Sequence, residues 1–197
     1  GPLDMRMDQR IDRTAADLLD GLSSQELEST LREFGEERWA KRIAKALVYE
    51  REKKPVGTTQ ELRQIVHRAI PGRFHSRKID PATRTFQAFR IRVNEELENL
   101  GRILETGWES LKRGGRICVI SFHSLEDRMV RDFGRARARD YTFTGGVDVP
   151  ELRHPRAPEL KWLRRKAATP GEAELAANPR SRSAQLSHSP QATSSRL

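Results

Sequence analysis

"GGRICVISFHSLEDR" (114–128) is the stretch that decides the fold. Its apolar run, residues 117–120, follows two glycines and an arginine and contains no charge. A short, continuous apolar run is typical of a strand covered on both faces. The run stops at Ser121, His123 and Ser124, and ligands of α/β enzymes bind beyond the ends of such strands. We therefore expect these residues to line a polar pocket; the alternative is an ordinary strand end at which Ser124 caps the next helix.

The residues that follow this strand tip indicate an α/β protein with an incomplete sheet. "LEDRMVRDFGRARA" (125–138) has a helical pattern, for which Ser124 and Asp127 would form the cap. Residues 140–160 are predicted to be loop-rich, 160–167 to be a possible strand, and the segment up to about 186 to hold a turn, a short helix and a last strand. So few strands do not make a stable sheet, and the chain reads as the later part of a parallel α/β layer.

Residues 14–112 are predicted to be almost entirely helical, because apolar residues recur there every three or four positions. Thr14 with Asp17, Ser23 with Glu26, and Thr58 with Glu61 are placed to begin three of these helices. Gly35 is a plausible left-handed stop. The longest pattern runs from Pro81 to about Lys112 and predicts one continuous helix.

Composition favours an acidic partner and argues against several classes of site. The formal net charge of +9 and the isoelectric point near 10.3 favour nucleic acid. The single cysteine, Cys118, excludes internal disulfides and lies in the apolar run, where we expect it to be buried. The five histidines lack metal-ligand spacing, so no metal site is predicted. No stretch approaches the roughly 20 apolar residues of a membrane span. The N-terminus "GPLDMRMDQR" lacks the apolar core of a signal peptide, so we expect a cytoplasmic protein.

Two further groups of residues are candidates for a functional site. Asp4 and Asp8 flank Arg6, an arrangement that suits a loop held by carboxylate–guanidinium pairs. Arg84, Gln87 and Arg90 recur every three residues beside an apolar helical stripe. Arginine and glutamine beside aromatic residues suit contact with RNA phosphates and base edges, and a solvated helix face is the alternative. No glycine-rich phosphate loop is present.

Taken together, these residues resemble the MraW/RsmH family. The segments that carry the resemblance are "GPLDMRMD" (1–8), "GEERWAKRIAKALV" (35–48), "PATRTFQAFRIRVNEEL" (81–97), "GGRICVISFHSLEDRMV" (114–130) and "NPRSRSA" (178–184). The resemblance covers residues 1 to about 186, in the family's order, and corresponds to its C-terminal two-thirds. It implies methyl transfer from S-adenosyl-L-methionine to N4 of a cytidine in small-subunit ribosomal RNA.

The resemblance also implies a fold and a division of the chain. The fold would be a partial Rossmann-like methyltransferase sheet with an inserted all-helical domain. Residues 1–9 would end the first methyltransferase segment, 10–80 would form the RNA-binding helical insert, 81–186 would return to the sheet, with 116–122 as a late parallel strand, and 187–197 would be a disordered tail. The family's motifs "GGH" and "DLG" are absent, so we expect the main cofactor site upstream of Gly1 and this chain alone to be inactive.

On this resemblance, Ser121, His123 and Ser124 would line the catalytic pocket, and Asp4 and Asp8 would brace its opposite wall. His123 would act as a general base, or in a hydrogen-bonding or structural role. The residues expected to contact RNA are Lys41, Arg42, Arg84, Gln87 and Arg90. Because methylation of an exocyclic amine needs no covalent cysteine adduct, Cys118 has no assigned role. The alternative function is a non-catalytic RNA- or ribosome-binding fragment of such an enzyme.

Overall fold

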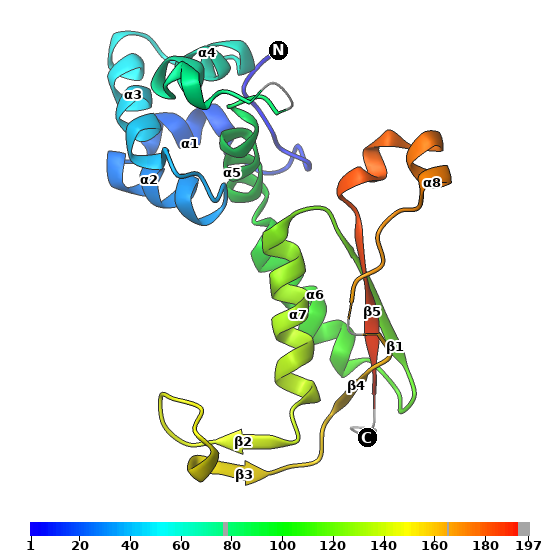
Figure 1. Ribbon diagram of the computed structural model, residues 1–197. Helices are drawn as coiled ribbons and strands as arrows, with labels where there is room; N and C mark the ends of the chain where they lie inside the picture. Colours follow the sequence, from blue (N-terminus) through cyan, green and yellow to red (C-terminus); the bar gives the residue numbers. More distant parts are fainter. Residues whose placement is uncertain (77–78, 165, 193–197) are drawn as a thin grey trace. The chain divides into compact units, whose positions relative to one another are not determined.

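A computed structural model describes residues 1–76, 79–164 and 166–192. The chain divides into two compact units, Gly1–Glu96 and Leu97–Leu197. The division falls at Glu96, whereas the family resemblance implied a helical insert that ends at residue 80. Figure 1 shows helices in the first unit, and helices and strands in the second. Each unit is described by itself below.

The first unit is a bundle of helices around one apolar core (Figure 1). Its elements are α1 (Ala15–Gly21), α2 (Ser24–Glu33), α3 (Ala40–Lys53), α4 (Thr59–Ala69), the short 3-10 helix η1 (Gly72–Phe74) and α5 (Thr83–Asn94). The core side chains come from all five α-helices and from the N-terminal segment, and include Leu3, Leu19, Leu27, Leu31, Ile43, Leu47, Leu62, Val66 and Phe89. Each of these has a relative exposure of 1% or less.

The starts of these helices follow local sequence rules. Capping boxes begin α1, α2 and α4, where the side chains of Thr14, Ser23 and Thr58 accept a bond from the third helical residue. The carboxylate of that third residue returns the bond to the cap's own N–H, so two otherwise unpaired donors are satisfied at each helix start. These predictions are confirmed.

Gly35 ends α2 for a different reason from the one predicted. The left-handed residue is Glu36, with φ of 47°. A Cβ on Gly35 would lie 2.7 Å from the carbonyl oxygens of both Leu31 and Arg84. Glycine is therefore needed at this position because the α5 backbone approaches closely, and no left-handed conformation is involved.

The long helix predicted over 81–112 is broken in two at Glu95. Glu95 has a left-handed backbone, with φ of 48° and ψ of 42°, and separates α5 from α6 (Glu96–Glu109). A left-handed glutamate is unfavourable by itself. Asn94 explains its stability, because its buried side chain bonds the backbone of Met5 and Met7 at 2.9 and 2.7 Å. Contacts distant in sequence thus override an unbroken helical pattern.

The second unit combines α6 with strands and one long helix (Figure 1). Its further elements are β1 (Arg116–Ser121), α7 (Ser124–Ala138), β2 (Tyr141–Phe143), η2 (Pro150–Leu152), β3 (Arg153–Pro155), β4 (Leu160–Trp162), α8 (Glu172–Ala177), η3 (Pro179–Ser183) and β5 (Gln185–Ala192). Trp108 and Leu160 form its small buried cluster, on which Ile117 and Phe133 pack. The segment predicted to be loop-rich, 140–160, contains the β2–β3 hairpin.

The main sheet has the strand order β1–β5–β4, and both pairings are antiparallel. The parallel layer expected from the sequence is not formed by these described strands. β1 lies at one edge and is not covered on both faces, since its exposed and half-buried residues alternate. Cys118 and Ile120 are exposed, Ile120 to 58%. The predicted burial of Cys118 is therefore wrong, because an apolar run does not encode whether both faces have neighbours.

The C-terminal segment is more ordered than the sequence indicates. A disordered tail was expected over 187–197, yet the backbone of residues 187–192 belongs to β5 and pairs with β1 and β4. Residues 193–197 lie outside the described residues. Within the part of the chain that the structure describes, no helix has the length and apolar character that a membrane span requires.

Candidate functional site

Ser121 closes β1 and holds it to β5. Its Oγ donates a hydrogen bond to the carbonyl of Gln185 over 3.3 Å, and the residue is only 2% exposed. The hydroxyl of Ser121 thus has a structural partner at the end of the strand. The backbone turns immediately afterwards, so that Phe122 is exposed and His123 begins the next helix.

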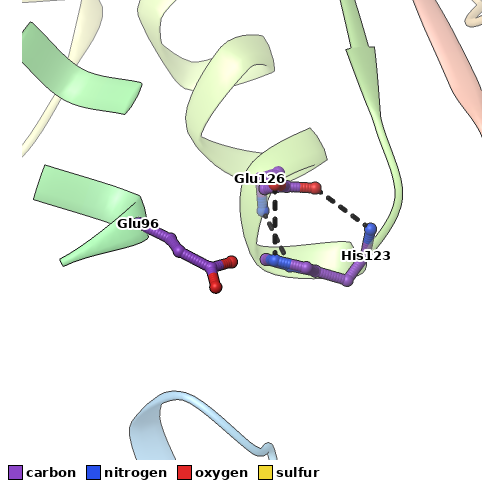
Figure 2. A group of neighbouring side chains, drawn as sticks. All are labelled: Glu96, His123 and Glu126. Atoms are coloured by element: carbon purple, nitrogen blue, oxygen red, sulfur yellow. Dashed lines mark hydrogen bonds and ion pairs between the residues drawn. The ribbon is translucent and has the colours of Figure 1, made fainter. Parts of the chain in front are cut away.

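His123 is the N-cap of α7 and, with Glu126, forms a capping box (Figure 2). The ring Nδ1 of His123 accepts a bond from the backbone N–H of Glu126 over 3.3 Å. Oε2 of Glu126 in turn accepts bonds from the N–H groups of Phe122 and His123, at 2.8 and 3.3 Å. Figure 2 shows the two side chains facing each other at the first turn of the helix. The strand tip is therefore a preorganised turn.

This geometry fixes the tautomer of His123. Because Nδ1 accepts a backbone bond, the proton of a neutral imidazole lies on Nε2. Nε2 approaches Oε1 of Glu126 to 3.5 Å, and the histidine side chain is only 8% exposed. A neutral His123 in this state is a hydrogen-bond donor through Nε2, which does not suit the removal of a proton by that nitrogen.

The predicted cap of α7 by Ser124 and Asp127 is wrong. Ser124 is the first residue of the helix and is exposed. Asp127 is 5% exposed and pairs with Arg131 at 2.9 Å. The cap was missed because histidine is not among the preferred N-cap residues. The signal was nevertheless present, since His123 and Glu126 have the three-residue spacing of a capping box.

The N-terminal acidic residues each pair with the arginine two positions later. Asp4 makes a two-pronged pair with Arg6, at 2.7 and 2.9 Å, and this pair lowers the pKa of Asp4 to about 2. Asp8 pairs instead with Arg10, at 2.7 Å, which lowers the pKa of Asp8. Arg6 also donates to the carbonyl of Ile11 over 2.8 Å. These contacts support the structural interpretation of both carboxylates; their placement opposite the strand tip stays a prediction.

The predicted polar row on α5 makes internal contacts. Arg84 donates to the Glu36 carbonyl over 3.1 Å, and Gln87 donates to the Phe34 carbonyl over 3.0 Å. Arg90 pairs with Glu96 at 2.8 Å. The first two contacts hold the end of α2 against α5. RNA contact by these three residues stays a prediction, and it would have to coexist with these bonds.

Lys41 and Arg42 lie on an exposed face of α3 that Lys45 extends by one turn. We call these three residues the basic face of α3. Further along the helix, Tyr49 is 60% exposed, and the ammonium of Lys53 lies 3.6 Å from the centre of its ring. Positive charge and an exposed aromatic ring thus share the surface of one helix, as in proteins that bind single-stranded nucleic acid.

Aromatic and arginine side chains next to the start of α3 were not predicted as site residues. The rings of Trp39 and Phe74 lie 5.0 Å apart, and the guanidinium of Arg38 lies over both, at 5.3 and 4.7 Å. Arg73 approaches Phe74 from its own side, at 5.0 Å. Trp39 is half-buried and packs against the apolar core of the first unit.

Arg38, Trp39 and Phe74 line a cleft of about 280 Å³ within the first unit. Its acidic members are already engaged, because Glu37 accepts from the Trp39 N–H at 2.8 Å and Asp80 binds His67 and Arg63. Burial alone would raise the pKa of Asp80, but bonds from the Ala82 N–H, His67 and Arg63 outweigh it and lower the pKa to about 2. The cleft therefore presents arginine and aromatic surface while its carboxylates are paired.

Comparison with known proteins identifies relatives along almost the whole chain. The model of the MraW methylase family matches residues 1–190. A relative from Trichlorobacter lovleyi is 48% identical over 189 residues, covering 94% of this chain and 59% of that protein. Relatives from Geobacter sp. strain M21 and Halothermothrix orenii are 49% and 45% identical and cover the same shares. All three are named ribosomal RNA small subunit methyltransferase H. The chain spans about 59% of the length of these relatives.

Proposed function

The chain belongs to the MraW methylase family, and from that premise we propose that it is part of an enzyme that methylates N4 of a cytidine in small-subunit ribosomal RNA. The methyl donor would be S-adenosyl-L-methionine, and the enzyme would act in the cytoplasm, on the RNA or on the small ribosomal subunit. The observation that carries the proposal is the match of residues 1–190 to the family model, together with relatives that are named for small-subunit ribosomal RNA.

The surface of the first unit supports RNA as the substrate. The basic face of α3 carries Lys41, Arg42 and Lys45 without an acidic residue among them, and it follows directly on Arg38 and Trp39. Ammonium and guanidinium groups neutralise phosphates and release counterions, which supplies most of the sequence-independent affinity for RNA. We assign the basic face of α3 to contact with the RNA backbone.

The strand tip supports a positioning role for His123. Methyl transfer to an exocyclic amine is an in-line displacement at a sulfonium, and correct placement of the amine supplies much of the rate. His123 fixes the start of α7, and with it the exposed Ser124 on the first turn. We assign to Ser124 the contact with the target base and to His123 the positioning of this turn. Proton removal by His123 has little support, since the nitrogen that carries the proton is a donor.

Substitution of His123 distinguishes a role in capping α7 from a role in proton transfer. In the Trichlorobacter lovleyi relative, the position aligned with His123 is made His, Asn, which is a strong N-cap, or Ala, which removes the cap. N4-methylcytidine in small subunits that lack the modification is measured by mass spectrometry, together with thermal unfolding. A positioning role predicts that His123→Asn keeps most of the activity and His123→Ala loses it. A rate loss of ~100-fold or more in His123→Asn, the scale of general-base catalysis, would contradict this role.

A second candidate is an RNA- or ribosome-binding protein without catalysis. It is favoured by the basic face of α3, which could bind RNA without any contribution to the chemistry. Titration calorimetry of this chain with S-adenosyl-L-methionine distinguishes the two. Binding only to RNA predicts no heat with the cofactor, whereas saturable heat with a defined stoichiometry would support an active methyltransferase.

A further inference from the structure

The helix α7 carries its positive charge entirely as arginine. Arg131 and Arg135 lie four residues apart on α7, which places their side chains on one side of the helix about 6 Å apart along its axis. Arg139 follows four residues later, as the residue with extended backbone that caps the end of the helix. All three are exposed. Together with Ala138, Asp140 and Trp162 they line a groove of about 510 Å³. We call this the α7 groove; all of its residues belong to the second unit.

Two arginines outside the α7 groove have structural roles at this helix. Arg137 faces the opposite way, over the Phe133 ring at 3.9 Å, and pairs with Glu105. Arg156 donates to the carbonyls of Ala136 and Arg139 and so neutralises the negative C-terminal end of the helix. Arg135 approaches Asp132 to 3.7 Å, and both side chains are more than 60% exposed. Such a pair contributes little to stability. Arg131 also pairs with the nearly buried Asp127 at 2.9 Å, so Arg135 and Arg139 are the groove arginines whose charges the fold does not account for.

Trp162 forms an aromatic wall of the α7 groove because residue 134 is glycine. A Cβ on Gly134 would overlap the indole ring of Trp162. The ring can therefore pack directly against the helix backbone while it remains half-buried. Arg139 is held beside it, 5.7 and 5.6 Å from the ring centres of Tyr141 and Phe143. The α7 groove is therefore lined by the indole of Trp162 and by arginines, of which Arg139 lies within 6 Å of two aromatic ring centres.

We propose that the α7 groove is a second RNA-binding surface, in which Arg131, Arg135 and Arg139 contact consecutive phosphates of a single strand and Trp162 stacks on a base. The inference rests on the proposed function, which makes RNA the substrate. Guanidinium groups bind phosphates and carboxylates alike in a two-pronged manner. The indole beside them favours RNA over an acidic polypeptide, because it offers a surface on which bases stack.

The first test measures RNA affinity against salt concentration. The whole chain is titrated into a fluorescein-labelled single-stranded RNA of about 16 nucleotides. Each phosphate contact to a single strand contributes about 0.7 to the slope of log affinity against log salt. The double variant Arg135→Gln/Arg139→Gln should therefore lower the slope by about 1.4 and weaken binding roughly 10- to 30-fold at ~0.1 M salt. Arg135→Lys/Arg139→Lys should keep most of the slope.

Matched variants separate this proposal from the proposed function. Arg113→Gln/Arg116→Gln removes the same charge at two exposed positions outside the groove and should change affinity by less than threefold. Lys41→Gln/Lys45→Gln tests the basic face of α3. If the α3 variant weakens binding and the groove variant matches the Arg113/Arg116 control, the α7 groove is overturned while RNA binding stands. If the unmodified chain does not bind the RNA, both proposals fail.

Fluorescence tests the stacking of Trp162. The tryptophans are Trp39, Trp108 and Trp162, and Trp108 is 4% exposed. In the Trp39→Phe variant, RNA should quench the emission of Trp162, and the groove variant should abolish this quenching. Polyglutamate, the acidic polypeptide probe, should bind weakly and leave the emission unchanged. Equal loss of RNA and polyglutamate binding in the groove variant, with no quenching by RNA, would assign the groove to an acidic protein and overturn the proposal.

Discussion

Asn94 binds the backbone on both sides of Arg6. Its Oδ1 accepts the N–H of Met7 over 2.7 Å, and its Nδ2 donates to the carbonyl of Met5 over 2.9 Å. Asn94 is 8% exposed, and Met5 has a left-handed φ of 64°. One buried amide therefore holds the N-terminal segment to the end of α5, at the point where the helix stops.

Replacement of Asn94 should destabilise the first unit strongly. Asn94→Leu keeps the approximate size of the side chain but leaves two backbone groups without their partner, a loss of about 2–3 kcal/mol. Urea unfolding followed by circular dichroism measures it. The exposed Asn99→Leu is the control and should change the free energy of unfolding by less than about 0.5 kcal/mol. Equal effects of the two substitutions would contradict the role of Asn94.

Acid should weaken the N-terminal loop through Asp4. Hydrogen bonds from Arg6 lower the pKa of Asp4 from 3.8 to about 2. Because the folded pKa lies below the unfolded value, the contribution of this pair to stability is fully present above pH 3.8 and is lost as the pH falls toward about 2. Asp4→Asn should flatten the dependence of unfolding on pH over this window, whereas the exposed Asp20→Asn should retain it. The measurement is urea unfolding at a series of pH values.

Alanine at two helical glycines should have opposite effects. Gly101 lies in α6, and a Cβ at this position would have no neighbour within 4 Å, so Gly101→Ala should stabilise the chain by up to about 1 kcal/mol. Gly134→Ala would overlap the Trp162 ring and should destabilise the chain by about 1–3 kcal/mol. Thermal unfolding of the two variants checks the signs, and a stabilised Gly134→Ala would show that Trp162 does not pack on α7.

Cys118 should react readily in the folded chain. It is the only cysteine and is exposed on β1, so an aromatic disulfide reagent should modify it at a rate close to that in denaturant. Absorbance of the released thiolate measures this rate, and Cys118→Ser gives the blank. Protection that disappears only on unfolding would mean that this face of β1 is covered.

The helix starts could be predicted from the sequence because their determinants are local. Thr14, Ser23 and Thr58 each find their partner three residues later, and every box forms as expected. The break at Glu95 could not be predicted in this way. It depends on Asn94 reaching Met5, 89 positions away, while glutamate and the apolar spacing around it both favour a continuous helix.

In the candidate site too, features that depend on neighbouring residues could be predicted, whereas contacts between distant parts of the chain could not. The strand tip lies where the polar residues follow the apolar run, but its cap is His123 rather than Ser124. Lys41 and Arg42 are exposed, as a surface for RNA requires, whereas Arg84 and Gln87 bond backbone carbonyls about 50 residues away, at 48 and 53 positions. A spacing rule identifies residues that share a helix face, but it does not show what packs against that face.

The antiparallel pairing of β1 with β5 has a consequence for the order of folding. Ser121 and Gln185 are 64 positions apart. The chain entropy lost on closing this loop must therefore be overcome before the hydrogen bonds between β1 and β5 can offset it. Neighbouring helices of the first unit, such as α3 and α4, close much shorter loops and should form earlier. During synthesis, β1 must wait with its edge unpaired until β5 has left the ribosome, and over that interval its free backbone edge can pair with another chain.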